Sequence, residues 1–218
     1  MPFDITNGDR DGGMFIFPFN FVWWSKVEEH SDIKSELMAE ITSDLMKRQD
    51  IYQDTLDWNC DVTTSFFDHE RVGILFNDNP ELSIRIQDIV MGYMDRMLPS
   101  IYNLTGTRNP SSSYLYHIWY NRYEKGNWQE FHDHDGSTFS GIYYLDITKG
   151  DSSTSFIDER INNYYSSSMV RRDSVLFGNN VDLEGRIVIF PSELAHYVNP
   201  SKGNRTTISF NIISEFNQ

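Results

Sequence analysis

Apolar side chains in the first half of the chain recur three or four residues apart, which is the spacing of one helix face. Between Ser25 and Arg48 these positions are Val27, Ile33, Leu37, Ile41 and Leu45. This pattern predicts an amphipathic helix over Ser25 to Arg48. Ser31 and Asp32 are good capping residues inside it, so two short helices are an alternative.

A second helix is predicted from Leu82 to Leu98, where apolar residues again share one face. Pro80 stands just before this stretch and Pro99 just after it. Proline is favoured in the first helical turn and interrupts a helix interior. The two prolines therefore predict where the helix begins and ends.

The second half of the chain has a different pattern, in which short apolar runs alternate with turn residues. After TGTRNPSSS the runs predict strands: YLYHIWYNRY, FSGIYYLDI, TSFID, SMVRR, GRIVIF and RTTISFNII. Helices followed by strands argue against a doubly wound sheet and predict an all-β core with flanking α-helices. We expect residues 1–105 to form a helical or mixed support region and 106–218 the β core, within one compact domain.

Composition narrows the class of protein. The 218 residues are 39% hydrophobic and 15% aromatic, enough for a substantial core. The net charge of −14 argues against binding nucleic acid through its phosphates, which requires a basic surface. Cys60 is the only cysteine, which excludes an intrachain disulfide, and no apolar run is long enough to span a membrane. These features predict a cytoplasmic protein of a reducing compartment, with neither nucleic acid nor membrane as a partner.

Three histidines have the spacing of a metal site. His132 and His134 are two residues apart, so on an extended segment they project from one face while Asp133 and Asp135 project from the other. His196 follows a buried strand and a proline turn. Imidazoles suit iron, zinc, copper and nickel, and three of them leave coordination positions open. The alternative is that HDHD is a solvated acidic turn.

The other three histidines lack such a context. His30 lies on a charged helical face and His69 in a polar loop or strand end, where a solvated side chain is expected. His117 is in the middle of a predicted strand, where a hydrogen-bonded interior histidine is the default. A metal site is therefore expected only around His132, His134 and His196.

Arg205 introduces a second kind of chemistry. It lies nine residues after His196 and shares a strand face with Thr207 and Ser209. An arginine directed into a β core is costly unless it meets an anion, and its forked guanidinium matches a carboxylate. Tyr144, on the strand after HDHD, could supply a hydroxyl to the same carboxylate. The alternative places Arg205 at a strand end in solvent.

Together these residues resemble a known family. The order His132-x-His134, IYYLD, IFP, His196 and Arg205 is similar to that of the 2-oxoglutarate/Fe(II)-dependent oxygenases. The likeness is greatest to the prolyl-4-hydroxylase-like group, which includes small phage and marine bacterial versions, and it covers roughly Tyr114 to Asn211. It implies a double-stranded β-helix, a cupin-like jelly roll, with N-terminal helical support.

The resemblance also implies roles for single residues. His132 and His196 would bind Fe(II), Arg205 would hold the far carboxylate of 2-oxoglutarate, and Tyr144 would assist it. Tyr123 matches a family tyrosine on the preceding strand that faces the co-substrate.

Further pocket residues follow from position on these strands. Asn121 and Trp119 share the strand face of Tyr123, although packing is an equal explanation for Trp119. Thr207 and Ser209 would add hydroxyl contacts. The cofactors implied are Fe(II), 2-oxoglutarate and O2.

The chain departs from the family at position 134, where histidine replaces the usual carboxylate. We expect His134 to be the second ligand, with Asp133 or Asp135 as alternatives if the segment is looped. The site then has one negative charge fewer, which should weaken Fe(II) binding.

The activity implied is hydroxylation of a C–H bond in a peptide or protein side chain, such as a prolyl residue, or in a small metabolite. The alternatives are a non-catalytic cupin-like jelly roll, a phage structural or interaction module, and a zinc hydrolase. The sequence leaves the substrate open, and also whether the chain is a monomer or a homodimer.

Overall fold

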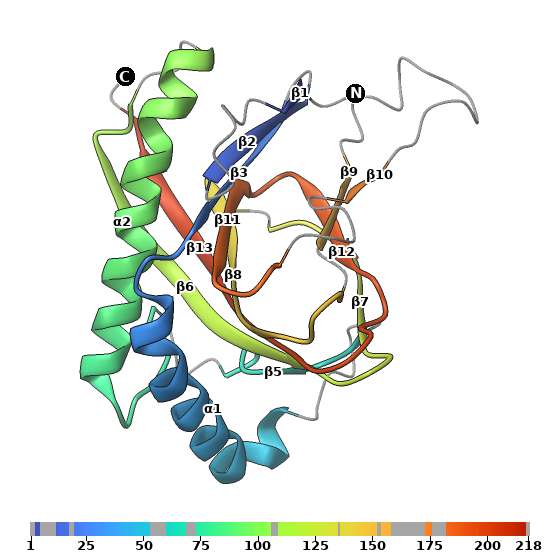
Figure 1. Ribbon diagram of the computed structural model, residues 1–218. Helices are drawn as coiled ribbons and strands as arrows, with labels where there is room; N and C mark the ends of the chain where they lie inside the picture. The colour runs from blue at the N-terminus through green and yellow to red at the C-terminus, as the bar shows by residue number, and fades with distance from the viewer. Residues whose placement is uncertain are drawn as a thin grey trace.

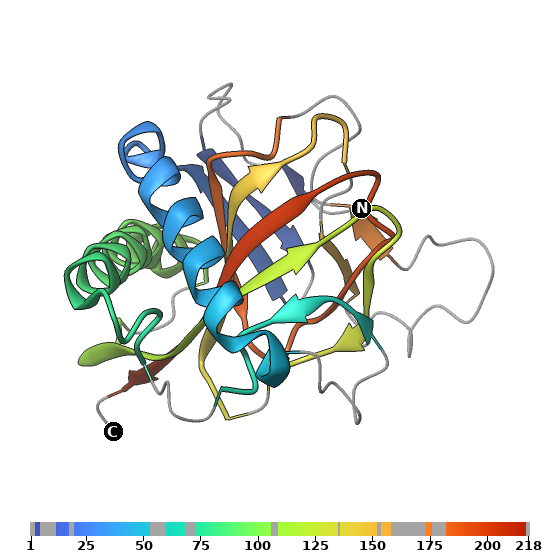
Figure 2. The same ribbon diagram turned by 90° about the horizontal axis from the view of Figure 1, so that it is seen from below.

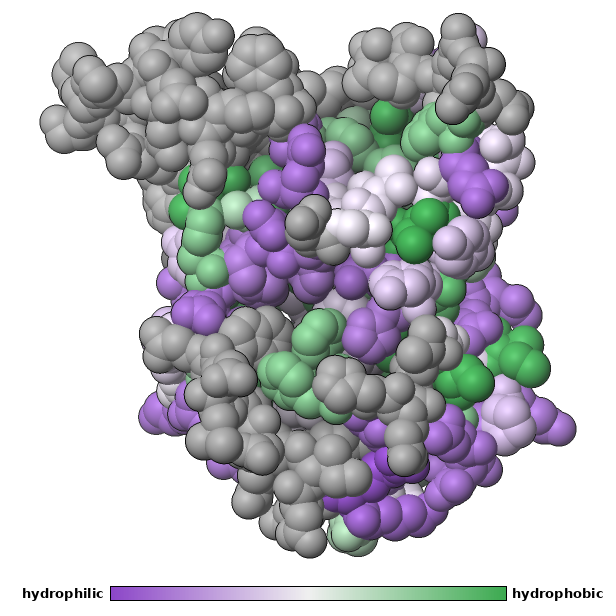
Figure 3. Space-filling model, turned by 180° about the vertical axis from the view of Figure 1, so that it is seen from behind, coloured by the Kyte–Doolittle hydropathy of each residue, from purple (hydrophilic) through white to green (hydrophobic). Residues whose placement is uncertain are grey.

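The computed structural model describes residues 3–4, 12–17, 20–52, 60–68, 73–105, 109–134, 136–151, 154–157, 173–175 and 182–216. Two long helices lie on one side of a β-rich body (Figure 1). No helix in these ranges combines the length and the apolar character needed to cross a membrane. From behind, hydrophilic residues cover much of the described surface, and hydrophobic residues form smaller groups between them (Figure 3).

The strands form two antiparallel sheets. The larger sheet has eight strands in the order β1-β2-β3-β11-β8-β13-β6-β5. Their bounds are β1 Phe3–Asp4, β2 Gly12–Phe17, β3 Asn20–Lys26, β11 Arg186–Pro191, β8 Phe139–Ile147, β13 Arg205–Glu215, β6 Ser112–Tyr123 and β5 Thr63–Thr64. The smaller sheet has the order β10-β9-β12-β7-β4. Its strands are β10 Asp173–Val175, β9 Thr154–Ile157, β12 Ala195–Val198, β7 Trp128–His132 and β4 Cys60–Asp61.

The helices differ from the predicted ones at their ends. α1 spans His30–Tyr52, because Ser25 and Lys26 still belong to β3. It is one helix from its start at His30, with a kink at Arg48 rather than a break near Ser31. Its buried stripe is the predicted one, with Ile33, Leu37 and Ile41 fully enclosed.

α2 spans Pro80–Thr105, with Asn79 as its cap. The side-chain oxygen of Asn79 accepts a hydrogen bond from the backbone N–H of Leu82 at 3.2 Å. The prediction that Pro99 ends this helix is wrong, since the helix continues through it. Met97 and Ile101 are buried on either side of Pro99, and this packing offsets the roughly 3 kcal/mol that an interior proline costs.

Five of the six predicted strands are present, as β6, β8, β9, β11 and β13, each with bounds within about two residues. The sixth, SMVRR, lies outside the described residues. The chain also contains strands that the sequence pattern missed. β2 and β3 are in the N-terminal region, and β3 pairs with β11, so this region extends the larger sheet.

The larger sheet is buried on both faces. The helices cover one face, where alternate residues such as Ile118, Tyr120 and Phe210 belong to the main apolar cluster with α1 and α2. Tyr120 also donates a hydrogen bond from its hydroxyl to Asp44 of α1 at 2.7 Å. Figure 2 shows the helices on that outer side of the β body. The other face of β6, β8 and β13 is turned to the smaller sheet, and this two-sheet arrangement is the predicted jelly roll with helical support.

Gly141 lies where β8 is too close to its neighbours for a side chain. A Cβ there would overlap the ring of Phe210 and lie 2.6 Å from the backbone oxygen of Val188. We expect Gly141→Ala to destabilise the fold by about 1–3 kcal/mol, seen as a lower urea midpoint. Gly92→Ala is the matched control, because nothing lies within 4 Å of that site on α2 and alanine favours helix. An unchanged midpoint for Gly141→Ala would contradict the close approach.

Candidate active site

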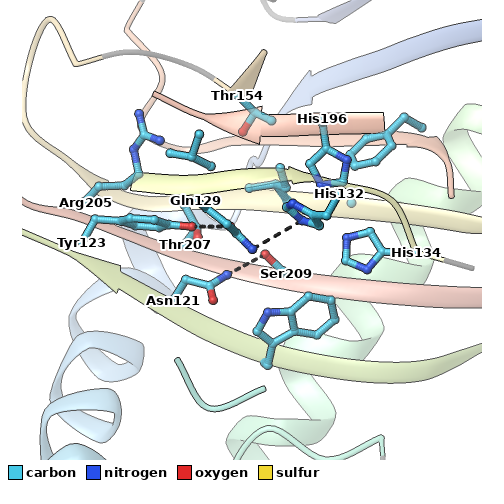
Figure 4. A pocket seen from close by; sticks show the side chains of 15 residues that line it. Asn121, Tyr123, Gln129, His132, His134, Thr154, His196, Arg205, Thr207 and Ser209 are labelled. Carbon is cyan, nitrogen blue, oxygen red and sulfur yellow. Dashed lines mark hydrogen bonds between the residues drawn. The ribbon is translucent and has the colours of Figure 1, made fainter. Parts of the chain in front are cut away.

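A polar pocket lies between the two sheets. The larger sheet contributes alternate residues of β6 and β13, and the smaller sheet contributes β7 and β12 (Figure 4). All three predicted histidines line it, with Trp119, Asn121, Tyr123, Arg205, Thr207 and Ser209. The site that the sequence distributes over 90 residues is therefore one place in the fold.

Strand pairing brings the three imidazoles together. His132 ends β7 and is the direct cross-strand partner of His196 on β12, so both side chains lie on one face. Their ring centroids are 4.3 Å apart. The backbone N–H of His134, just past β7, bonds to the carbonyl of Ser192 at 3.0 Å. One nitrogen from each ring can be chosen so that all three lie within 4.8 Å of one another.

Backbone carbonyls orient two of these rings. His132 Nδ1 is 2.7 Å from the carbonyl oxygen of Glu130, and His196 Nδ1 is 3.1 Å from that of Leu194. A carbonyl oxygen can only accept, so each Nδ1 carries the proton. The lone pair of each neutral ring is therefore on Nε2, the arrangement found around metal-binding histidines.

Burial keeps all three imidazoles neutral. Loss of hydration lowers the pKa of His132, lowers the pKa of His134 to about 3, and lowers that of His196 well below its usual value. Mutual repulsion adds to this effect for His134 and His196. A neutral imidazole is the form that binds a metal, so the cluster is ready to do so near pH 7.

Arg205 lies at the other end of the pocket beside Tyr123 (Figure 4). It is only 1% exposed, and its Nε is 3.4 Å from Oδ2 of Asp151. That carboxylate accepts hydrogen bonds from the Ser201 hydroxyl and the backbone N–H of Lys202. Asp151 thus supplies counter-charge, and Arg205 is not at a solvent-exposed strand end.

Several polar atoms of the pocket have no hydrogen-bond partner among the described residues. They are Nε and Nη2 of Arg205, Oδ1 of Asn121 and Nε1 of Trp119. A buried donor without a partner costs about 1–3 kcal/mol, so such atoms mark a place for a polar ligand. The guanidinium donors fit a carboxylate, and the imidazole lone pairs fit a divalent metal. The residues present therefore suit Fe(II) and 2-oxoglutarate.

Tyr144, the residue expected to assist the co-substrate carboxylate, contacts β9. Its hydroxyl donates to Thr154 Oγ1 at 3.0 Å and accepts from the Thr154 backbone N–H at 3.2 Å. Thr154, not Tyr144, lines the pocket. The β8 alternation does direct Tyr144 inward, but the sequence could not show that its hydroxyl would bond to Thr154 of β9.

Gln129 is a pocket residue that the sequence analysis missed. It lies on β7, is 6% exposed, and contacts both Tyr123 and His132. Its position three residues before His132 could have indicated a place near the metal site. Glutamine occurs on many strands, however, so this indication was weak.

The remaining candidates lie elsewhere. Asp133 is exposed, and Asp135 is outside the described residues, as is His69. His30 is not solvated as expected, because its Nδ1 lies 2.7 Å from the Tyr143 hydroxyl. His117 packs beside Phe66 and Trp119 and does not line the pocket.

Comparison with known proteins bears on the enzyme class. Residues 117–211 match the family model described as "Putative 2OG-Fe(II) oxygenase". Over this span, fewer than half of the 218 residues, the chain is similar to the 2OG-Fe(II) oxygenases. The matched span holds every residue of the predicted site, and the match confirms the predicted enzyme class with its Fe(II), 2-oxoglutarate and O2. No curated protein matches the sequence of this chain.

The solved structures that are similar to this chain include three prolyl hydroxylases. A prolyl hydroxylase from Trichoplax adhaerens, in complex with a hypoxia inducible factor peptide fragment, is 12% identical, with a TM-score of 0.50 over 88% of this chain and 83% of its own. A Pseudomonas putida prolyl-4-hydroxylase is 15% identical, covering 89% and 93% (TM-score 0.46). A viral collagen prolyl hydroxylase from Paramecium Bursaria Chlorella virus-1, in a 2OG complex, is 14% identical, covering 87% and 94% (TM-score 0.48).

Proposed function

We propose that this oxygenase hydroxylates a C–H bond of a peptide or protein side chain, such as a prolyl residue, or of a small metabolite. The single observation that supports this best is the shared pocket. Three neutral imidazoles converge at one end, and a buried arginine with unused donors lies at the other. A cupin-like protein that only binds metal has no use for such an arginine.

Each group in the pocket has a proposed role. His132, His134 and His196 hold the metal, and Arg205 binds the distal carboxylate of 2-oxoglutarate. Tyr123 flanks that carboxylate, because the Cζ atom of Arg205 lies over the Tyr123 ring, 5.6 Å from its centroid. Asn121, Thr207 and Ser209 line the floor between the two ends, and the Asn121 amide is held by Ser209 at 3.0 Å.

Fe(II) and 2-oxoglutarate, when bound, activate O2 for hydroxylation of the substrate and yield succinate and CO2. The protein binds and orients these groups and excludes water. Phe190 forms an apolar wall beside the His196 imidazole, and Val198 forms one beside Tyr123. The strands on both sides exclude water from this end of the pocket. Few water molecules then compete for Arg205, which strengthens its interaction with the 2-oxoglutarate carboxylate.

Anaerobic titration with Fe(II) and 2-oxoglutarate tests the proposal. We expect a visible charge-transfer band of the metal chelate, and succinate release when O2 and a substrate are added. Screening peptides and small metabolites by succinate release over the background rate would then identify the substrate class. If the band does not appear and calorimetry detects no binding of 2-oxoglutarate, the proposal is wrong.

The histidine at position 134 permits a test of the charge argument. Glutamate reaches about as far as the imidazole and would add the missing negative charge. We expect His134→Glu to bind Mn(II) more tightly, measured by calorimetry, because a buried anion attracts the cation strongly. The metal-free variant should melt at a lower temperature, since its carboxylate is then buried without a partner.

His134→Gln is the matched control, because it has the size of glutamate without its charge. Its affinity for Mn(II) should not exceed that of the unaltered protein. If His134→Glu also shows no gain, position 134 does not contact the metal, and the ligand set proposed above must be revised.

A further inference from the structure

Gln129 joins the two ends of the pocket through its side-chain amide. The hydroxyl of Tyr123 donates to Gln129 Oε1 at 2.8 Å, and Gln129 Nε2 lies 3.3 Å from His132 Nε2 (Figure 4). Tyr123 in turn flanks Arg205, so one chain of contacts runs from the arginine to a metal-binding histidine.

The hydrogen-bond network determines which way this amide faces. His132 Nδ1 must donate, because its partner is the carbonyl oxygen of Glu130. The Nε2 of the same neutral ring can then only accept, so Gln129 presents its N–H group to it. The opposite amide orientation would place two acceptors against each other. The hydroxyl of Tyr123, donating to Oε1, agrees with this assignment.

This hydrogen bond uses the atom that a metal would need. An imidazole Nε2 has one lone pair, so a metal bound there displaces the Gln129 N–H. Tyr123 still holds Oε1, which keeps the amide in the pocket. A displaced N–H in a buried pocket requires a new acceptor. The carboxylate of a co-substrate bound between Arg205 and the imidazoles is an acceptor of the right charge.

We propose that Gln129 is a positioning residue that couples metal binding to co-substrate binding. Its N–H donates to His132 Nε2 before a metal binds. Once a metal is bound to that nitrogen, the N–H donates to the co-substrate instead. The inference rests on the proposed function. It predicts that Gln129 opposes the metal when 2-oxoglutarate is absent and supports the metal when 2-oxoglutarate is present.

The test is calorimetric titration of the full chain with Mn(II), without and with saturating 2-oxoglutarate under anaerobic conditions. The measured quantity is the factor by which 2-oxoglutarate tightens Mn(II) binding. Gln129→Met keeps the side-chain length but removes the amide. It should bind Mn(II) at least as tightly as the unaltered protein without 2-oxoglutarate and more weakly with it. We expect the tightening factor to fall about tenfold or more.

Gln129→Glu is a second variant in case the first folds poorly. Its carboxylate can still accept from Tyr123, but it has no N–H and repels the co-substrate, so the tightening factor should fall again. Gln87→Met is the matched control, since its amide bonds to the Gly73 carbonyl and lies outside the pocket. Its factor should equal that of the unaltered protein.

Two outcomes would overturn the inference. One is an unchanged tightening factor in both Gln129 variants. The other is Mn(II) binding that weakens equally with and without 2-oxoglutarate, which indicates that Gln129 only supports the fold around His132. If the unaltered protein binds no Mn(II), or binds it no tighter with 2-oxoglutarate, the proposed function itself fails and the inference with it.

Discussion

Arg205→Met should lose at least about 97% of the 2-oxoglutarate affinity of the metal-loaded protein while metal binding persists. The guanidinium is buried, and two of its nitrogens have no hydrogen-bond partner among the described residues. Removing one partner of a buried charged pair costs about 2–5 kcal/mol, which is a factor of roughly 30 to several thousand. Calorimetric titration of 2-oxoglutarate into Mn(II)-loaded protein measures this loss.

Arg205→Lys distinguishes charge from shape. Lysine keeps the positive charge but lacks the planar fork that binds a carboxylate through two parallel hydrogen bonds. We expect an affinity between those of the unaltered protein and Arg205→Met. Arg205→Met removes the counter-charge of Asp151, and Arg205→Lys removes the Nε that contacts it, so the melting temperatures of both variants must be compared first. Unchanged 2-oxoglutarate binding in a folded Arg205→Met would show that Arg205 only balances Asp151.

His196→Ala should abolish metal binding over the accessible range, with an affinity loss of more than about 100-fold. Replacing only the residues that orient metal ligands typically costs 10–100-fold, so losing a ligand costs more. His196 is 97% buried, its Nδ1 is held by the Leu194 carbonyl, and among the described residues only His132 and His134 form a metal-binding group with it. The readout is the rise in melting temperature on adding Mn(II), which a tight site produces by mass action.

His30→Ala is the matched control for this substitution. It also removes an enclosed imidazole, the one bonded to Tyr143, but that ring lies outside the pocket. Its melting temperature should be lower, while the rise on adding Mn(II) should remain. A full Mn(II) response in His196→Ala would mean that the metal binds elsewhere in the chain.

The sequence pattern predicted the strands that are long and rich in apolar residues. β8 and β13 are examples, because both faces of these strands are buried and their composition is plainly apolar. β7 and β12 were missed as strands, although they hold His132 and His196. Their residues face a polar pocket on one side, so hydrophobicity does not mark them.

The N-terminal strands were missed for a different reason. β3, NFVWWSK, has four consecutive apolar residues, but it is followed at once by a helical pattern, and its last residues fit that helix. Pairing with β11, about 160 residues later, decides in favour of the strand. The continuation of α2 through Pro99 is likewise a result of packing that no local rule contains.

The sequence by itself determined the chemistry: three histidines, one arginine nine residues after the last of them, and a strand alternation that places Thr207 and Ser209 on the face of Arg205. Order and spacing sufficed, because side chains alternate on a strand whatever it pairs with. Only the tertiary structure decided which groups meet. The cross-strand pair of His132 and His196, the hydrogen bond of Tyr144 to Thr154, and the place of Gln129 between Tyr123 and His132 all depend on which strands become neighbours. That choice is made by burial over the whole sheet, and no single stretch of sequence carries it.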